Sequence, residues 1–327
     1  MRELRVLLTG ATGFVGSHLL HRISREQVTV YVLIRSTANT WRIQDLLSSV
    51  NVVRGDLLNR DEIGETLKEI RPEICIHVAW YAVPGKYLTS YENVNMLHGT
   101  ISLVNQLAKV GCNRFVGVGT CIEYDTNLGY LSEKSATKPR NLYAACKLST
   151  CNILTQLCRD LGMGFAWARL FYQYGPTEDK TRFVPSVIHS LLGGERTIVK
   201  NGDLRRDFLH VEDTAAAIWS VAGSHLSGPV NIGSAEAPSL GDIALTIGEI
   251  LGRPNLVEVE TATQDEPKLI CADTSLLRKN TAWTPNYDLA EGLRQTVAWW
   301  QTRCVEDSTS LLAERISEGR RISEERA

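Results

Sequence analysis

Residues 4–20 read LRVLLTGATGFVGSHLL, in which a β-rich apolar run, a glycine-rich turn and an amphipathic run follow one another directly. The first run predicts a buried strand and the last predicts a helix. Between them, Gly10 permits a tight turn, Gly13 lets the backbone approach a pyrophosphate, and Gly16 lets the helix lie close to the sheet. The N–H groups and the dipole at the start of the helix favour an anion. The stretch therefore predicts a dinucleotide-binding site.

The same alternation of apolar and amphipathic runs continues through the first half of the chain. The apolar runs predict buried strands at Leu4–Thr9, Val28–Ile34, Val50–Arg54, Ile74–Val78, Phe115–Gly119 and Phe165–Arg169. The amphipathic runs predict helices at Phe14–Ile23, Asp61–Ile70, Thr100–Val110 and Tyr143–Asp160. This repetition predicts an α/β fold with a Rossmann-type, doubly wound parallel sheet and helices on both of its faces.

The regular alternation of strand-like and helix-like runs ends after about Tyr174. Further helices are predicted at Val184–Leu192 and Leu289–Gln301, and Val211–Ser224 could return to pack on the first domain. We therefore expect three parts. The first is a dinucleotide-binding Rossmann domain over 1–174, with a returning segment near 207–235. A smaller C-terminal substrate lobe over 175–303 and a charged C-terminal tail over 304–327 follow.

Composition and charge argue against several classes of function. A formal net charge of -2 provides no basic field that would attract nucleic acid or an anionic membrane. No apolar run approaches the roughly 20 residues of a membrane span, and no signal peptide is visible, so a cytoplasmic protein is expected. The eight cysteines show neither C-x-x-C spacing nor a Cys/His cluster, so neither a metal site nor a disulfide framework is expected. Five of them are interpreted as reduced core residues, namely Cys75, Cys146, Cys151, Cys158 and Cys271.

The end of the predicted second strand bears on the choice of cofactor. Arg35 and Ser36 stand where an acidic side chain would accept a hydrogen bond from the ribose 2′-OH of NAD. An arginine pairs instead with a 2′-phosphate, and no carboxylate is present here to repel that phosphate. The sequence therefore favours NADP(H) over NAD(H).

The pattern YAACK at residues 143–147 carries the candidate chemistry. Positions four apart share one face of a helix, so the Tyr143 phenol and the Lys147 ammonium are expected to project into the same space. The ammonium is expected to lower the Tyr143 pKa and to let the phenol exchange protons near neutral pH. Thr120 follows the predicted fifth strand at the carboxyl edge of the sheet, where its hydroxyl can hydrogen-bond a reacting oxygen.

The glycine spacing and the Thr, Tyr and Lys group resemble the short-chain dehydrogenase/reductase superfamily. Residues 76–79 (IHVA), 171–176 (FYQYGP) and 206–211 (RDFLHV) resemble its extended subgroup, the NDP-sugar epimerase/dehydratase family, and the likeness extends from residue 1 to about 303. The resemblance implies an NAD(P)-dependent oxidoreductase with a catalytic group made of Thr120, Tyr143 and Lys147. It implies cofactor contacts from Gly10, Thr12, Gly13, Phe14, Val15, Gly16, Arg35, Ser36, Asp56, Leu57, Ala79, Tyr143 and Lys147.

The resemblance also implies a nucleotide-activated sugar as substrate, and dTDP- or CDP-linked sugars are expected. The expected substrate contacts are Trp80, Tyr81, Cys121, Tyr172, Arg182 and Arg206. Arg182 and Arg206 match positions where the family clamps the diphosphate, a task that suits a bidentate arginine. Tyr172 replaces the Asn that family members usually place there to bind the diphosphate.

Departures from the family pattern indicate the reaction. The 4,6-dehydratases carry an Asp-Glu pair directly after the catalytic Thr, whereas this chain has Cys121 and Ile122, so elimination of water is not expected. Residues 77–87 and 119–125 look like the 4-ketoreductases of NDP-6-deoxyhexose pathways. Together with Arg35, this likeness favours NADPH-dependent reduction of the C4 keto group of a nucleotide-activated 4-keto-6-deoxyhexose, a step of deoxysugar biosynthesis.

Two alternatives stay open. One is an NAD-dependent NDP-sugar 4-epimerase, which uses the same Tyr143 and typically keeps its cofactor bound. The other is a non-catalytic NADP-binding sensor or scaffold of the same fold, although such proteins commonly lose the Tyr or the Lys that this chain retains. The helices predicted at Thr100–Val110 and Tyr143–Asp160 resemble those that pair across a two-fold axis in the family, so a homodimer is expected.

Overall fold

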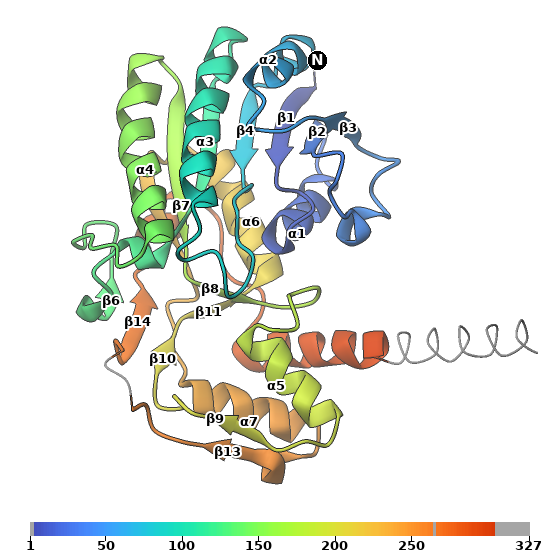
Figure 1. Ribbon diagram of the computed structural model, residues 1–327, viewed down its shortest axis with the longest axis vertical. Helices are drawn as coiled ribbons and strands as arrows, with labels where there is room; N and C mark the ends of the chain where they lie inside the picture. Colours follow the sequence, from blue (N-terminus) through green and yellow to red (C-terminus); the bar gives the residue numbers. More distant parts are fainter. Residues whose placement is uncertain (1–2, 264–265, 305–327) are drawn as a thin grey trace, which may run out of the picture.

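The computed structural model describes residues 3–263 and 266–304, so the predicted tail beyond residue 304 lies outside the described residues. In the described part, seven strands form one parallel sheet in the order β12-β7-β5-β4-β1-β2-β3 (Figure 1). The strands are β1 (Leu4–Thr9), β2 (Val28–Ile34), β3 (Asn51–Arg54), β4 (Ile74–His77), β5 (Arg114–Thr120), β7 (Gly164–Leu170) and β12 (Gly228–Ile232). This sheet confirms the predicted Rossmann-type fold.

Helices cover both faces of the sheet (Figure 1). On one face, α1 packs against α6, and on the other α3 packs against both α2 and α4. Their bounds are α1 (Phe14–Ile23), α2 (Arg60–Ile70), α3 (Glu92–Lys109), α4 (Leu142–Asp160) and α6 (Val211–Ala222). A buried apolar cluster lies under each layer. Burying both faces explains why the strands are almost continuously apolar.

Helix α3 begins at Glu92, so the predicted start at Thr100 was wrong. The first turns contain two asparagines and end near Gly99, residues that weaken the helical pattern in the sequence. The structure gives one of these polar residues a specific use. Asn93 is fully buried, and its side-chain amide donates to the carbonyls of Tyr87 and Ser90 at 2.6 and 2.8 Å. The start of α3 therefore anchors the loop that precedes it.

A smaller lobe lies below the carboxyl ends of the strands (Figure 1). Its apolar core includes side chains of α5 (Phe183–Leu192), of α7 (Leu240–Ile250) and of the helical residues 289–304. The remaining elements are the strands β6 (Tyr130–Leu131), β8 (Tyr172–Tyr174), β9 (Thr197–Val199), β10 (Arg205–Arg206), β11 (Phe208–His210), β13 (Val257–Val259) and β14 (Leu269–Ala272) and the helix α8 (Ser275–Asn280). The chain enters this lobe after β8, returns to the sheet with α6 and β12, and enters the lobe again.

Among the described residues, the five cysteines that the sequence placed in the core are buried and carry free thiols. No helix of this part of the chain combines the length and the apolar character that crossing a bilayer requires. Nor does this part bring three or more His, Cys, Asp or Glu side chains together in a way that could hold a metal ion.

Candidate active site

The glycine turn lies directly against the end of β4. Gly10 has φ +77°, a left-handed conformation that favours glycine. A Cβ at this position would lie 2.5 Å from the Ala79 backbone nitrogen, and a Cβ at Gly16 would overlap the Gly10 carbonyl oxygen. Larger residues at either glycine would therefore push the turn away from the sheet, and Ala79 is brought to the turn as predicted.

The first turn of α1 is open for an anion. Gly13 is the N-cap residue, provides no side-chain hydrogen bond, and is exposed, and the first turn contains no acidic residue. Thr12, Phe14 and Val15 surround it and are half-buried. An uncapped helix start with its backbone N–H groups facing outward is a general binding site for phosphate groups. The arrangement fits the pyrophosphate of a dinucleotide.

The carboxyl ends of β2 and β3 present two arginines. Arg35 and Ser36 are exposed, as a contact to the adenosine half of a cofactor requires. Arg54 ends β3 and is exposed beside them, and its Nη1 donates to the Arg35 carbonyl oxygen at 3.4 Å. The Asp56 carboxylate accepts from the Leu58 backbone nitrogen at 3.0 Å, which is a turn-forming contact, and Leu57 between them is half-buried. The sequence reasoning missed Arg54, although its place at a strand end was visible.

Trp80 connects the glycine turn to the catalytic group. It follows Ala79, and its indole ring lies 3.8 Å from the Lys147 Nζ, a cation–π contact. Its Nε1 donates to the Asn93 Oδ1 at 2.8 Å, which fixes the plane of the ring. Trp80 therefore touches a predicted catalytic residue, while the neighbouring Tyr81 is half-buried.

The structure brings together the three predicted catalytic residues. Thr120 is the last residue of β5, Tyr143 and Lys147 lie on the first turns of α4, and the Thr120 side chain interacts with the Tyr143 phenol. The Lys147 ammonium is buried and donates to the Val118 carbonyl oxygen at 2.6 Å. Burial lowers the pKa of Lys147 to about 7, so this group titrates near neutral pH.

The expected lowering of the Tyr143 pKa was wrong. Burial raises the pKa of the phenol above its ordinary value, and the neighbouring Tyr87 and Glu123 add to the increase, while the interaction with Thr120 opposes it. The Lys147 ammonium lies 5.9 Å from the centre of the phenol ring and is directed to the Val118 carbonyl. Spacing along the helix predicted the proximity of the two groups but not where the ammonium points.

Tyr87 is a site residue that the sequence reasoning did not identify. Its ring packs edge-to-face on the Tyr143 ring with the centroids 4.8 Å apart. The Arg182 guanidinium lies 5.3 Å from the centre of the Tyr87 ring, a cation–π contact that joins the start of α5 to the loop before α3. The Tyr143 backbone nitrogen donates to the Leu88 carbonyl oxygen at 3.1 Å. This loop therefore covers the start of α4 and meets Arg182 above the catalytic group.

Three other predicted substrate residues lie close to one another. Cys121 is buried next to the half-buried Tyr172, and Arg206 interacts with Tyr172. The Arg206 guanidinium also donates to the Pro267 carbonyl oxygen at 2.8 Å and to the Glu266 carboxylate at 3.2 Å. In this structure Arg206 is therefore held by the protein's own groups, whereas Arg182 lies over the Tyr87 ring and interacts electrostatically with Glu178 and Asp179.

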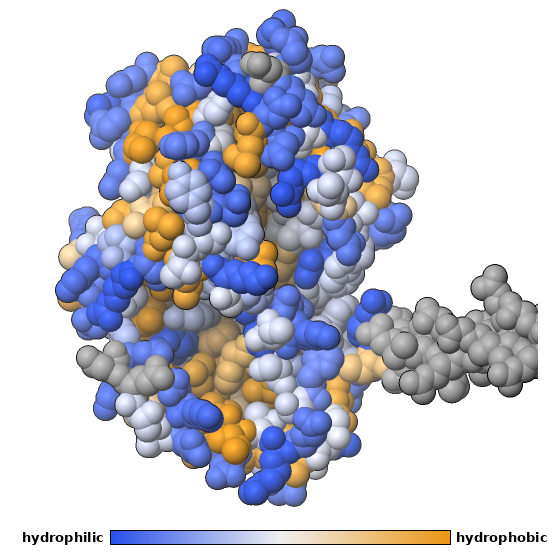
Figure 2. Space-filling model, viewed as in Figure 1, coloured by the Kyte–Doolittle hydropathy of each residue, from blue (hydrophilic) through white to orange (hydrophobic). Residues whose placement is uncertain are grey.

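The space-filling view shows the surface hollowed between the sheet domain and the smaller lobe, with apolar residues inside the hollow (Figure 2). Open α/β sheets bind ligands at the carboxyl ends of their strands. Both the glycine turn and Thr120 lie at those ends. The arrangement can therefore hold a dinucleotide along the sheet edge and a second ligand between the lobes.

Comparisons with known proteins agree with this geometry. UDP-glucuronic acid decarboxylase 1 of Xenopus tropicalis is 25% identical over 309 residues, which cover 91% of this chain and 72% of that protein. The UDP-glucose 4-epimerase of Thermotoga maritima, solved with UDP-glucose, has a TM-score of 0.83 at 20% identity over 92% of this chain and 100% of that one. The dTDP-glucose 4,6-dehydratase of Bacillus anthracis, solved with NAD, has a TM-score of 0.81 at 21% identity over 91% and 97%. The two structural likenesses show the fold.

The match to a family model is broader than any single motif. The model described as the NAD dependent epimerase/dehydratase family matches residues 6–233, which include the glycine turn and the Thr120, Tyr143 and Lys147 group. The predicted enzyme of NAD(P)-dependent oxidoreductase type is confirmed at this level. The chain belongs to the NAD dependent epimerase/dehydratase family.

Proposed function

We propose that this enzyme uses NADPH to reduce the C4 keto group of a nucleotide-activated 4-keto-6-deoxyhexose. The observation that carries the proposal is the pair of exposed arginines, Arg35 and Arg54, at the ends of β2 and β3. Two guanidinium groups favour a 2′-phosphate, and Arg35 stands where an NAD-dependent enzyme uses a carboxylate. A reductase must release its oxidised cofactor after each turnover. Enzymes that do so typically use the cofactor that carries the 2′-phosphate, NADP(H).

The residues of the cofactor site fit a nicotinamide dinucleotide. The turn at Gly10–Gly16 would hold the pyrophosphate and the two arginines the adenosine half, while Lys147 would hold the nicotinamide ribose. When bound, the nicotinamide supplies or accepts a hydride. The protein's own contribution is orientation and proton transfer.

Proton transfer in this proposal belongs to Tyr143. The Thr120 hydroxyl orients the carbonyl oxygen of the substrate, and the Tyr143 phenol gives its proton to that oxygen as negative charge develops on it. Burial raises the pKa of Tyr143, so the phenol carries its proton at neutral pH, as a proton donor requires. The Lys147 ammonium adds a positive charge near the reacting oxygen.

Three side chains after Thr120 argue against elimination of water. Burial raises the pKa of the Cys121 thiol to about 12, and Ile122 has no proton to exchange. The Glu123 carboxylate is fully buried and accepts hydrogen bonds from Thr120, Trp167 and Arg169. None of these groups is an acid or base that a sugar hydroxyl can reach, which supports reduction over a 4,6-dehydratase reaction.

The proposed substrate lies between the lobes. Arg182 and Arg206 are proposed to bind its diphosphate, with Trp80, Tyr81, Cys121 and Tyr172 around the sugar. Arg206 would exchange its present contacts to Glu266 and the Pro267 carbonyl for phosphate oxygens, a substitution that a guanidinium makes readily. We propose a dTDP- or CDP-linked sugar, although the similar proteins named above act on UDP- and dTDP-linked sugars.

The decisive experiment follows the absorbance of NADPH at 340 nm with dTDP-, CDP- and UDP-linked 4-keto-6-deoxyhexoses. Stoichiometric loss of NADPH with formation of the alcohol supports reduction.

Conversion of a UDP-hexose to its C4 epimer without net change in the cofactor would instead establish the 4-epimerase. The fold likeness to a UDP-glucose 4-epimerase favours that second candidate. A chain that binds NADPH and converts none of these sugars would refute both candidates and leave the sensor or scaffold.

Arg35→Ser is expected to weaken NADPH binding by roughly 10–100-fold and to leave NADH binding unchanged. The arginine contributes hydrogen bonds to a charged phosphate that only NADPH carries, worth about 1.5–3 kcal/mol. Fluorescence titration of each cofactor measures the effect. The matched control is Arg196→Ser, since Arg196 is exposed in the smaller lobe and pairs with Glu258 at 3.4 Å. An equal loss of both cofactors would contradict a contact to the 2′-phosphate.

Tyr87→Ala is expected to lower kcat/KM by about tenfold without loss of cofactor affinity. An aromatic pair contributes about 0.5–1.5 kcal/mol beyond its buried area, and this variant removes the contacts of Tyr87 to both Tyr143 and Arg182. Steady-state kinetics and a thermal melt measure the change. Tyr91→Ala in the same segment is the control, because Tyr91 is 69% exposed. Equal effects of the two variants would show that Tyr87 has no special role.

The homodimer is also a proposal. The outer faces of α3 and α4 lie side by side, and Ile153 on α4 is 41% exposed. A two-fold pairing of these helices would bury that surface in a four-helix arrangement. Light scattering after size-exclusion chromatography gives the mass directly.

A further inference from the structure

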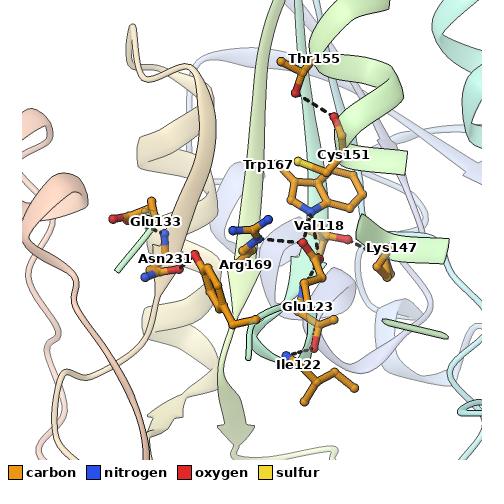
Figure 3. A network of polar contacts seen from close by, with 12 residues as sticks. Val118, Ile122, Glu123, Glu133, Lys147, Cys151, Thr155, Trp167, Arg169 and Asn231 are labelled. Carbon is orange, nitrogen blue, oxygen red and sulfur yellow. Dashed lines mark hydrogen bonds and ion pairs between the residues drawn. The ribbon is translucent and has the colours of Figure 1, made fainter. Parts of the chain in front are cut away.

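A buried carboxylate lies directly behind the catalytic threonine. Glu123 belongs to a short 3₁₀ turn, Cys121–Glu123, that follows β5, and it is fully buried. Its Oε1 accepts from the Thr120 backbone nitrogen at 2.8 Å and from the Trp167 Nε1 at 3.0 Å. Its Oε2 accepts from the Arg169 Nε at 2.7 Å (Figure 3). We call Glu123, Trp167 and Arg169 the Glu123 network.

The register of two neighbouring strands builds this network. Gly117 of β5 pairs with Trp167 of β7, and Gly119 pairs with Arg169. A Cβ at Gly119 would lie 2.6 Å from the Glu123 Oε1 and would overlap the Trp167 indole nitrogen. The glycines of β5 therefore leave the space that the indole and the carboxylate occupy. Their presence in a strand interior, where glycine is otherwise unfavourable, has a physical reason here.

The contacts continue from Arg169 away from the site to β12. The Arg169 guanidinium lies 4.3 Å from the centre of the Tyr124 ring, and the Tyr124 hydroxyl donates to the Asn231 Oδ1 at 2.8 Å. Asn231 belongs to β12, and its side-chain amide donates to the Leu131 carbonyl oxygen at 2.8 Å. Glu123 is thus held directly by groups on β5 and β7, and Arg169 and Tyr124 connect it to β12.

A buried ion pair of this kind is in general weak evidence for a stabilising role. Taking a carboxylate and a guanidinium out of water is costly, and apolar residues of similar volume often replace such a pair without loss of stability. The carboxylate also acts on the catalytic group, since it raises the pKa of Lys147 against the larger, opposite effect of burial. The uncharged groups around the Lys147 ammonium are the Val118 carbonyl of β5 and the rings of Trp80, Trp167 and Tyr143. Its charged or titratable neighbours are Glu123 and His77 of β4. Burial lowers the pKa of His77 to about 3, so His77 is neutral.

We propose that Glu123 is a positioning residue, which holds Thr120 in hydrogen-bonding reach of Tyr143 and places a fixed negative charge behind Lys147. The inference rests on the proposed catalytic role of Thr120, Tyr143 and Lys147. It does not depend on whether the enzyme reduces or epimerises its sugar, because both reactions use the same three residues. Substrate never touches Glu123 in this arrangement, because its carboxylate is enclosed by the protein.

The test removes the charge and follows the pH dependence of cofactor binding. Glu123→Gln keeps the shape of the side chain, and the double variant E123V/R169L removes both charges and so leaves no unpaired guanidinium. With the negative charge gone, the Lys147 ammonium loses its proton at lower pH. Fluorescence titration with NADPH between pH 6 and 9 is therefore expected to show the alkaline loss of affinity about one pH unit lower. The kcat at neutral pH is expected to fall about tenfold, with a smaller change in KM.

Two further variants separate this role from a purely structural one. Glu123→Asp keeps the charge but shortens the reach to Thr120, so it is expected to lower kcat without moving the pH midpoint of NADPH binding. Glu133→Gln is the matched control: its carboxylate accepts from the Asn231 backbone nitrogen at 2.9 Å in the outer part of the same region. This control is expected to lower the melting temperature and to leave both the midpoint and kcat unchanged.

The results that would overturn this inference differ from those that would overturn the proposed function. If the folded E123Q or E123V/R169L protein keeps the wild-type pH midpoint and kcat, the inference is overturned while the proposed function stands. If Tyr143→Phe is fully active, the proposed function fails first. Circular dichroism establishes which variants fold. Because E123D retains the ion pair, this variant still tests the positioning of Thr120 if E123Q and E123V/R169L fail to fold.

Discussion

A Tyr143→Phe enzyme is expected to turn over its keto-sugar about 10²–10⁴ times more slowly than the wild type while it binds NADPH almost as tightly. The range is what a positioned general acid contributes to a reaction. Phenylalanine keeps the edge-to-face contact with Tyr87 and removes only the hydroxyl that interacts with Thr120. Single-turnover kinetics with excess enzyme measure the chemical step, and fluorescence titration measures the cofactor affinity.

The control for this experiment is Tyr130→Phe. Tyr130 lies on β6, is 55% exposed and belongs to no part of the proposed site. It should leave kcat unchanged. A Tyr143→Phe enzyme with near-normal turnover would mean that another group delivers the proton, and the assignment of the whole catalytic group would have to be abandoned.

Gly13→Val is expected to abolish measurable cofactor binding in a protein that still folds. The φ of Gly13 is -80°, and a Cβ there would meet only the Gly10 carbonyl oxygen at 3.3 Å, so the fold tolerates a side chain after a small shift. The branched side chain would occupy the space in front of the helix start where the pyrophosphate binds. Loss of two hydrogen bonds to a charged group costs about 3 kcal/mol or more, which is a loss of affinity of at least roughly 100-fold.

The matched control is Gly223→Ala at the end of α6. Gly223 has φ -82°, and the nearest atom to an added Cβ is the Trp219 carbonyl oxygen at 3.8 Å. It should bind NADPH as the wild type does. Calorimetric titration of both variants, with circular dichroism to verify the fold, gives the comparison. Wild-type affinity in Gly13→Val would show that the cofactor does not lie on the start of α1.

Features with a local cause could be predicted from the sequence. The strand, turn and helix around Gly10 follow from hydrophobic period and glycine spacing, and the structure has them at the predicted residues. The common face of Tyr143 and Lys147 follows from helix geometry alone. In both cases the residues that interact are close in the sequence, so no knowledge of the tertiary fold was needed.

The Glu123 network could not be predicted in this way. Glu123 appears in the sequence as one acidic residue in a turn, and its buried position depends on which residues of β5 and β7 are opposite one another. Trp167 and Arg169 lie more than 40 positions away along the chain. The pairing of Tyr87 with Arg182 is a contact of the same kind, since it joins a loop of the sheet domain to the smaller lobe.

The two wrong expectations have a common physical cause. The start of α3 was placed too late because its first turns contain polar residues. The pKa of Tyr143 was expected to fall because Lys147 was assumed to face the phenol, whereas burial raises it. In both cases a polar side chain points to a tertiary partner. Asn93 turns to Trp80, and the Lys147 ammonium turns to the Val118 carbonyl. Sequence spacing gives the face of a helix but not the partner that a side chain selects.

The position of β12 at the edge of the sheet has a consequence for the nascent chain. On the ribosome, β7 emerges long before residues 228–232, and until they arrive its outer row of backbone N–H and C=O groups has no strand to pair with. Unpaired edges of this kind promote association between copies of a protein. The newly made polypeptide therefore passes through an interval of aggregation risk that closes only when part of the second lobe has been synthesised, and a chaperone would be of most use during that interval.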